Sequence, residues 1–320
     1  MEAICGFSGA VLVTRDGTAV LQASAGVSDF DTGAMCTTDT RFQIASVSKQ
    51  FTATAAMLLV EEGEVSLGDP ISSWLTDCPT RWHDLTLQQL LSHTSGMGHW
   101  RDHPGFDINQ PGDVDELLDQ FSKVPLLGTP GSAWHYSGPG YLLTARIIEQ
   151  VSGQAYAGFL TERVLQPLGL TSTCVGEPPT AAVACGYREG LRVDAAKFAA
   201  LPGSGDVWST VGDLDRFTAG FNSGGILTAR SREAMVASQA SMAGAWGAEG
   251  PATADAYGYG YCLGSLAGHA ARFHFGDNPG YQSFLAWLPR LRVTVAVLCN
   301  DEATRIDDVL RQLLPAVTGS

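Results

Sequence analysis

The chemistry that this chain could perform begins with a serine and a lysine three residues apart, Ser46 and Lys49. On a helix this spacing places the serine hydroxyl and the lysine amine one turn apart on the same face. A serine becomes nucleophilic when a base takes its proton, and a neutral lysine can be that base. Residues 51–60 are almost all apolar or small, so we expect a buried helix, and burial lowers a lysine pKa from about 10.4 toward neutrality. The alternative is structural: a lysine on a buried helix that reaches a carboxylate.

Composition limits the classes of protein to consider. The chain has 320 residues, enough for one large or two ordinary domains with a substantial core. Hydrophobic residues make up 45% and charged residues 16%, which is typical of a compact globular protein. The net charge is −14. Because phosphate backbones and anionic membranes attract basic surfaces, we expect neither nucleic acid nor a membrane as partner.

The cysteines and the N-terminus suggest a reducing compartment. The seven cysteines are odd in number, widely spaced and without a C-x-x-C pair, which argues against both a disulfide framework and a zinc site. His99 and His103 lie four apart but lack a third ligand, so we expect no metal and no other cofactor. The first residues carry neither a basic nor an apolar leader segment, and no run of 18 apolar residues occurs. The expected location is cytoplasmic.

Strand patterns lie toward both ends of the chain, and helix patterns lie between them. Residues 8–28 predict a β-hairpin, and residues 46–62 predict a helix that ends at Gly63. Further helices are expected over 86–91, 113–123, 141–152, 159–165, 211–222 and 306–314, and strands over 257–264, 272–275, 283–288 and 293–298. This order predicts an α+β fold in which terminal strands form one antiparallel sheet flanked by helices. We expect a sheet domain (1–63 and 204–320), an inserted, mostly helical domain (64–203) and an active site at their junction.

Three short motifs follow one another along the chain: Ser46-x-x-Lys49, Tyr136-Ser137-Gly138 and His274-Phe275-Gly276. Other segments accompany them in order, namely Leu-Leu-Ser-His-Thr-Ser-Gly at 90–96, Gln-Pro-Leu-Gly-Leu at 166–170 and Pro-Gly-Tyr at 279–281. Together they resemble the serine β-lactamase and penicillin-binding-protein-like superfamily, in particular its class C β-lactamase and family VIII esterase branch. The resemblance extends over nearly the whole chain, and its β-lactamase/transpeptidase-like fold agrees with the predicted one.

This resemblance implies acyl transfer through a covalent intermediate. Ser46 would attack a carbonyl carbon, and Lys49 and Tyr136 would share the proton transfers, with Tyr136 as a phenolate-like base or as a relay to the leaving group. The backbone N–H groups of Ser46 and Asp277 would form the oxyanion hole. His274 would be the remaining catalytic residue, with a purely structural role as the alternative. Water or another nucleophile would then release the acyl group.

Three departures from the family pattern concern the substrate. Gly138 stands where relatives usually carry an asparagine, which casts doubt on efficient β-lactam or peptide cleavage. His274 stands where typical β-lactamases carry a lysine, and a histidine binds a carboxylate only when protonated. Asp277 places a carboxylate beside the expected oxyanion hole. We therefore expect a substrate that is neutral or whose acid group lies elsewhere.

The expected substrate pocket is partly apolar. Trp100, in the loop 97–112, and Tyr281 would form its walls, next to Gly138 and Gly276. His93, at the end of a helix, is interpreted as structural. The N-terminal helix common in the family is not evident, so the face it would cover is expected to lie under the C-terminal helix or a second subunit, which leaves a homo-oligomer open.

Three functions remain to be separated. The leading hypothesis is a serine hydrolase, an esterase or amidase that acts on a small ester, amide or thioester. The second is an acyltransferase, or other altered acyl chemistry, on the same nucleophile. The third is a non-catalytic binding protein of the same fold. Intact Ser46, Lys49 and Tyr136 favour the first two.

Overall fold

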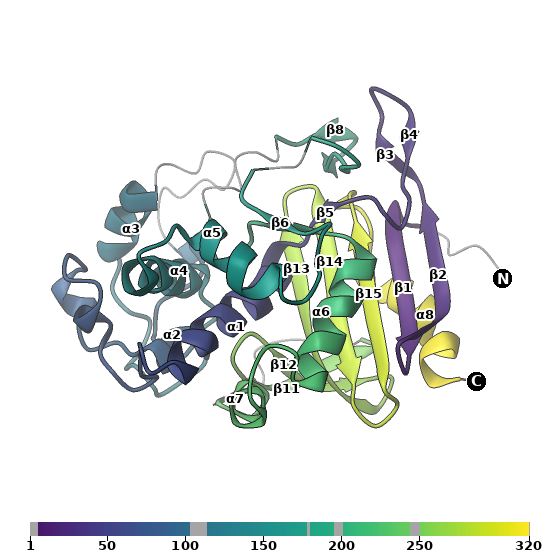
Figure 1. Ribbon diagram of the computed structural model, residues 1–320. Helices are drawn as coiled ribbons and strands as arrows, with labels where there is room; N and C mark the ends of the chain where they lie inside the picture. The colour runs from purple at the N-terminus through teal and green to yellow at the C-terminus, as the bar shows by residue number, and fades with distance from the viewer. Residues whose placement is uncertain (1–5, 103–113, 178–179, 195–200, 244–249, 320) are drawn as a thin grey trace.

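The centre of the molecule is one antiparallel sheet of eight strands (Figure 1). The computed structural model describes residues 6–102, 114–177, 180–194, 201–243 and 250–319. In spatial order the strands are β10 (Ala240–Ser241), β11 (Ala252–Tyr257), β12 (Cys262–Leu266), β13 (His269–Asn278), β14 (Tyr281–Leu288), β15 (Val293–Cys299), β1 (Gly9–Arg15) and β2 (Thr18–Ala25). The N-terminal hairpin β1–β2 joins the C-terminal strands through β15, with Val11 opposite Val297. The expected antiparallel sheet completed by both ends of the chain is therefore confirmed.

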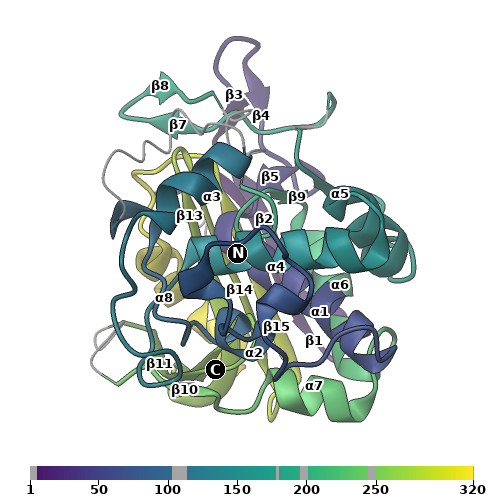
Figure 2. The same ribbon diagram turned by 90° about the vertical axis from the view of Figure 1, so that its left-hand side faces the viewer.

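Helices cover both faces of this sheet. They are α1 (Ser48–Glu61), α2 (Leu87–Leu91), α3 (Val114–Ser122), α4 (Gly138–Ser152), α5 (Tyr156–Leu160), α6 (Val211–Ser223), α7 (Ala229–Met235) and α8 (Ile306–Thr318). Helix α6 packs on β1 and β15, while α8 contacts β1, β14 and β15 from the other face. Helices α2 to α5 gather at one side of the sheet, the side that faces the viewer in Figure 2. Within the described ranges, every helix is too short or too polar to traverse a bilayer.

The two-residue period of the strands decides which core each side chain enters. In β15, Ala296 and Leu298 belong to the larger core, which also contains α1 and α6. Their neighbours Val295 and Val297 belong to the second core, under α8. Successive side chains of a strand point to opposite faces, so a strand covered on both faces is apolar throughout, as β15 is.

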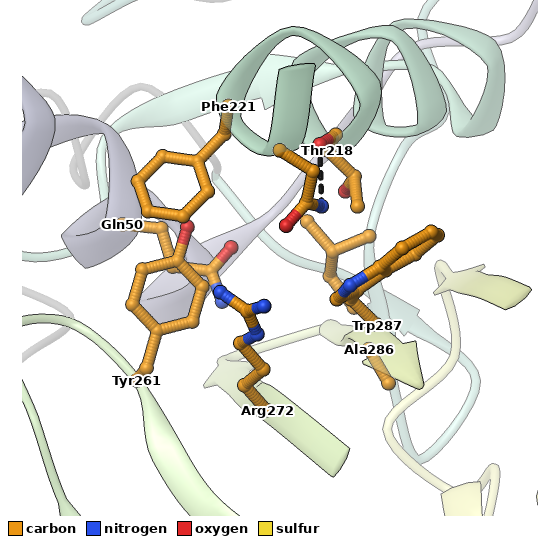
Figure 3. A pocket seen from close by; sticks show the side chains of 9 residues that line it. Gln50, Thr218, Phe221, Tyr261, Arg272, Ala286 and Trp287 are labelled. Carbon is orange, nitrogen blue, oxygen red and sulfur yellow. Dashed lines mark hydrogen bonds between the residues drawn. The ribbon is translucent and has the colours of Figure 1, made fainter. Parts of the chain in front are cut away.

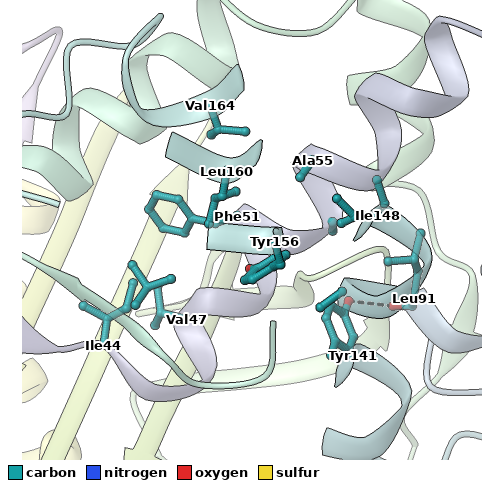
Figure 4. Close-up of a cluster of buried hydrophobic side chains, with 14 of the residues drawn as sticks. Ile44, Val47, Phe51, Ala55, Leu91, Tyr141, Ile148, Tyr156, Leu160 and Val164 are labelled. Carbon is teal, nitrogen blue, oxygen red and sulfur yellow. Dashed lines mark hydrogen bonds between the residues drawn. The ribbon is translucent and has the colours of Figure 1, made fainter. Parts of the chain in front are cut away.

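Helix α1 lies inside the larger core (Figure 4). Its residues from Ser48 to Leu59 are all buried, and Phe51 stacks on Phe217 of α6 with ring centroids 4.0 Å apart. A helix that is buried on every side cannot show the polar stripe of a surface helix. This explains why its sequence is apolar or small almost throughout. The helix ends at Glu61, followed by Gly63 in the left-handed region (φ +77°).

Short strands complete the fold away from the main sheet. They are β3 (Val27–Asp29) paired with β4 (Ala34–Met35), β7 (Tyr187–Arg188) paired with β8 (Leu191–Arg192), and β5 (Phe42–Gln43), β9 (Val207–Ser209) and β6 (Cys174–Val175) in a small sheet of three. In this small sheet β5, which comes just before Ser46, pairs with β9, which follows residue 206, and β9 also pairs with β6. Segments that precede α1 and follow α5 are thus brought together.

The structure corrects some of the expected boundaries. The strand expected over 257–264 is wrong, because residues 258–261 form a turn between β11 and β12. A side chain at Gly258 would lie 2.1 Å from the Met235 carbonyl oxygen, and Gly260 has φ +80° and packs against the backbone of α1. Helix α4 begins three residues earlier than expected, since the Ser137 side chain caps it by accepting from the N–H of Gly140.

Candidate active site

Ser46 lies in a tight 3-10 turn, Ala45–Val47, that leads directly into α1. It is partly exposed, while the residues from Phe42 to Ala45 and from Val47 to Gln50 are buried. Ala45, directly before it, has φ +47° although it carries a Cβ. A non-glycine residue in this region is strained and is held there by its surroundings. The turn therefore presents the Ser46 side chain outward from a rigid, buried frame.

The Lys49 amine sits beside the Ser46 hydroxyl. Its Nζ lies 3.1 Å from Ser46 Oγ, 2.7 Å from the Ser204 carbonyl oxygen and 3.2 Å from Ser204 Oγ. A protonated lysine donates all three N–H bonds to these oxygens. A neutral amine keeps two N–H bonds for Ser204 and can turn its lone pair to the Ser46 hydroxyl. The geometry is that of a base held against its proton donor.

Burial makes the neutral form of Lys49 accessible. The side chain is 1% exposed, and this burial lowers its pKa to about 7. The carboxyl group of Asp206 opposes the shift, since a nearby negative charge favours the ammonium. Asp206 is itself 1% exposed, burial raises its pKa to about 7, and it accepts a hydrogen bond from the Gly203 N–H. A buried amine and a buried carboxyl group thus influence one another behind the candidate nucleophile.

Tyr136 reaches the same hydroxyl from the start of α4. Its side chain hydrogen-bonds with Ser46, and the Lys49 Nζ lies 5.1 Å from the centre of its ring. Burial raises the pKa of the Tyr136 phenol well above 10, more than the bond to Ser46 lowers it. The phenol is therefore protonated at neutral pH. This favours the relay role predicted for Tyr136 over the phenolate-like base.

His274 lies in β13 behind Tyr136 and is held as a neutral ring. It is fully buried, its Nδ1 bonds the Phe275 carbonyl, and its Nε2 lies 3.0 Å from the Tyr257 hydroxyl. Because a carbonyl only accepts, Nδ1 carries the proton and Nε2 accepts from Tyr257. Burial, reinforced by the nearby Lys49, lowers the pKa of His274 to about 3. The third motif therefore presents no positive charge at neutral pH.

The third motif also lies against the Ser46 turn. A Cβ at Gly276 would lie 2.2 Å from Ser283 Oγ and 2.4 Å from the Ile44 carbonyl oxygen, so only glycine permits this approach. Asp277, the next residue, is exposed and pairs with Gln282 across the sheet. The two segments that would supply the oxyanion hole are the turn that carries Ser46 and the end of β13 that carries Asp277, and these two segments are in contact. Their N–H groups remain a prediction.

The expected pocket residues lie in different surroundings. Trp100 is 5% exposed and its ring is tilted against that of Phe121. It fills the space beside Gly138, where a Cβ would lie 2.1 Å from the indole Nε1. Tyr281 is 1% exposed and its hydroxyl donates to the Ala184 carbonyl. The structure thus encloses Tyr281 in the protein, where it supports β14 and offers no open face as a pocket wall. Most of the loop after Asp102 lies outside the described residues.

His93 holds the segment that carries Tyr136. Its Nδ1 accepts from the Ser137 N–H at 3.1 Å, and its carbonyl accepts from His135. Its ring lies 4.4 Å from that of Tyr136, and burial lowers its pKa well below 6.5. His93 thus binds backbone at a helix end, as its structural interpretation required. His103 lies outside the described residues, and among those described no group of three His, Cys, Asp or Glu could hold a metal.

Sequence reasoning missed three residues of this site: Ser204, Asp206 and Tyr257. Ser204 and Asp206 are 155 and 157 positions from Lys49, in a loop without periodic pattern. Tyr257 begins the strand expected over 257–264, and that pattern does not predict its contact with His274. The one available signal was a carboxylate in the apolar stretch Leu201–Trp208, which calls for a buried partner.

Comparison with known proteins agrees with this geometry. The beta-lactamase family model matches residues 5–317. Penicillin-binding protein 4 of Amycolatopsis lactamdurans is 30% identical, over 92% of this chain and 82% of its own length. Esterase EstB of Burkholderia gladioli is 34% identical over 50% of this chain, but the match spans only 44% of EstB. The chain thus spans less than half the length of that relative.

A solved structure shares the fold. The D-amino acid amidase of Ochrobactrum anthropi SV3, complexed with L-phenylalanine, superimposes with a TM-score of 0.83 at 23% identity, over 97% of this chain and 94% of the amidase. The order of strands, the buried helix after Ser46 and the family match across nearly the whole sequence lead to one conclusion. The chain belongs to the beta-lactamase family, with the fold of the penicillin-binding proteins.

Proposed function

We propose that this protein is a serine hydrolase that forms an acyl-enzyme on Ser46 and cleaves a small ester or amide. The observation that carries the proposal is the contact of 3.1 Å between Lys49 Nζ and Ser46 Oγ, made by an amine whose pKa is about 7. A serine with a neutral amine in hydrogen-bond reach is the arrangement that nucleophilic catalysis needs. The site lies where the helical insertion meets the sheet, at the proposed domain junction.

The proton path follows from the pKa values. Neutral Lys49 takes the proton of Ser46 as its oxygen bonds to the substrate carbonyl carbon, and the resulting oxyanion faces the N–H groups of Ser46 and Asp277. Tyr136, protonated and bonded to Ser46, gives its proton to the leaving alkoxide or amine and regains one from the Lys49 ammonium. Water then attacks the acyl-enzyme and Lys49 accepts its proton. As the bond between the acyl carbon and Ser46 Oγ breaks, the Lys49 ammonium returns that proton to Ser46 Oγ, and the acid product leaves.

The charges of the site favour a neutral acyl group. His274 is neutral where many relatives place a cation, and Asp277 is an exposed carboxylate next to the turn. An anionic acyl group would meet no compensating positive charge from His274. EstB is named as an esterase and the Ochrobactrum protein as an amidase, which supports these substrate classes.

A panel of p-nitrophenyl esters tests the proposal, with neutral and carboxylate-bearing acyl chains of equal length. We expect hydrolysis of the neutral esters, a drop of at least tenfold in kcat/KM for the anionic ones, and loss of activity in Ser46→Ala. Ser223→Ala removes an exposed hydroxyl at the end of α6 and serves as the matched control. A fluorophosphonate should add to Ser46, which mass spectrometry of the peptide detects.

Two results would redirect the assignment. Faster product formation on addition of an alcohol or amine acceptor than in water alone would make the protein an acyltransferase on the same nucleophile. No adduct on Ser46 with either reagent would support the non-catalytic binding protein and overturn the hydrolase.

A further inference from the structure

A small cleft lies on the sheet beside α1 and α6, apart from Ser46 (Figure 3). Strand β13 contributes Arg272, α1 contributes Gln50, and α6 contributes Thr218 and Asn222, with Tyr261 and Trp287 closing the sides. The cleft leaves about 10 Å³ for the centre of a water-sized group. That is about the room of one water molecule, so only a ligand of similar size can enter.

Among the described residues, no carboxylate forms an ion pair with the cation in this cleft. Arg272 is partly buried and makes no ion pair or hydrogen bond within the described residues, whereas many other arginines of the chain bind a carboxylate. Burial and the nearby Arg232 lower the pKa of Arg272, and its other titratable neighbour, Tyr261, carries no charge at neutral pH. A buried cation is normally paired, because removing it from water is costly. In a chain of net charge −14, such a group calls for a partner from solution.

The Gln50 side chain gives an independent indication of a missing ligand. Gln50 is 1% exposed, and its Oε1 is buried without a hydrogen-bond partner. In Figure 3 the Arg272 guanidinium points away from the sheet toward Gln50 and α6. An oxygen only accepts and would not bind an anion, but a half-turn about the last bond of the side chain puts the carboxamide N–H groups in its place. The Tyr261 hydroxyl makes no hydrogen bond within the described part of the chain and is a further donor.

We propose that this cleft binds one monatomic anion, such as chloride, with Arg272 as its charged ligand and Gln50 and Tyr261 as neutral donors. The site goes beyond the acyl chemistry at Ser46 and does not depend on it. Since Gln50 directly follows Lys49 in α1, the bound anion would also hold the first turn of the helix that carries the candidate base.

Thermal unfolding in sodium chloride and in sodium gluconate, at equal ionic strength, tests this site, because gluconate is too large for the cleft. We expect chloride to raise the Tm saturably, by roughly 2–4 °C at ten times its dissociation constant. Arg272→Met should lose this response. Arg290→Met, which removes an exposed arginine after β14, should keep it. An equal response in Arg272→Met, or none in the unmodified protein, would overturn the site.

A second measurement needs no variant, in case Arg272→Met does not fold. Crystals of the unmodified protein grown without halide and soaked in sodium bromide should show an anomalous peak within hydrogen-bond distance of the Arg272 guanidinium. A cleft that holds only water, with no bromide peak, would refute the proposal.

Discussion

At the scale of single residues, the state of the site depends on the proton of Lys49. Its amine is 1% exposed, and its three hydrogen-bond acceptors are Ser46 Oγ and the two oxygens of Ser204. Burial in a low-dielectric surrounding favours the neutral amine, and the Asp206 carboxylate favours the ammonium. These opposing influences leave the pKa of the amine near neutral pH, which suits a base that accepts a proton from a serine hydroxyl.

The first prediction concerns this proton. Lys49 acts as a base only when deprotonated, so kcat/KM for a neutral ester should rise with pH through an apparent pKa near 7 and fall about tenfold per unit below it. Lys49→Arg, which stays charged, should reduce kcat/KM by roughly 10³ or more at every pH. A pH profile from 5 to 9 measures both. A flat profile would exclude Lys49 as the base.

The second prediction concerns Asp206. In Asp206→Asn the carboxamide oxygen can still accept from the Gly203 N–H, but the negative charge that raises the pKa of Lys49 is gone. The part of the pH profile in which kcat/KM rises, its acid limb, should therefore move to lower pH. Activity at pH 6 should rise roughly threefold relative to activity at pH 8. Asp215→Asn, on α6 outside the site, serves as the control and should leave the limb in place. A limb that moves to higher pH in Asp206→Asn would contradict this account.

At the scale of secondary-structure elements, α4 makes a close contact at its first residue, two positions after Tyr136. Gly138 begins the helix, is fully buried, and lies under the indole of Trp100. The tryptophan thus takes the space that a side chain at position 138 would need. A glycine at position 138 and the tryptophan at position 100 therefore depend on one another.

The third prediction follows from this contact. Gly138→Ala should destabilise the protein by about 1–3 kcal/mol, because its Cβ would lie 2.1 Å from the Trp100 ring. In a protein that already carries Trp100→Ala, Gly138→Ala should cost at least 1 kcal/mol less than it costs in the unmodified protein. Gly158→Ala in α5 is the control, since a Cβ there meets nothing within 4 Å. Urea unfolding of the unmodified protein, the two single variants and the double variant measures the coupling. Free energies of unfolding that add would argue against the contact.

At the scale of the whole molecule, buried groups that stay neutral make the free energy of unfolding depend on pH. His274 connects β13 to the site and is fully buried, with a pKa lowered from 6.5 to about 3. Between these two values the unfolded chain binds a proton that the folded protein does not. Stability therefore contains a contribution that is complete above pH 6.5 and is lost as the pH falls toward 3.

The fourth prediction isolates that contribution. A single such group changes the free energy of unfolding by about 1.4 kcal/mol per pH unit between pH 6.5 and 3. His274→Gln, which can accept from Tyr257 without titrating, should give a shallower decline of Tm from pH 6.5 to 4. His269→Gln, at the start of β13 and not fully buried, should not change the slope. Equal slopes in all three proteins would show that His274 does not carry the effect.

Local sequence signals were sufficient for part of this molecule. The serine and lysine three residues apart, the apolar stretch after them and the alternation of the terminal strands each reflect a short-range period, so helix α1, the hairpin β1–β2 and strands β14 and β15 could be predicted. Order along the chain was also enough to predict one sheet closed by both ends, because antiparallel strands with two apolar faces need partners.

The tertiary structure alone decided the protonation and surroundings of the site. Ser204 and Asp206 meet Lys49 across more than 150 residues, Trp100 meets Gly138 across 38, and Tyr281 turns out to be enclosed rather than open. Burial and electrostatic neighbours arise from packing between distant segments, and no spacing in the sequence encodes them. The residue types state which chemistry is available, and packing determines their pKa values and the space around them.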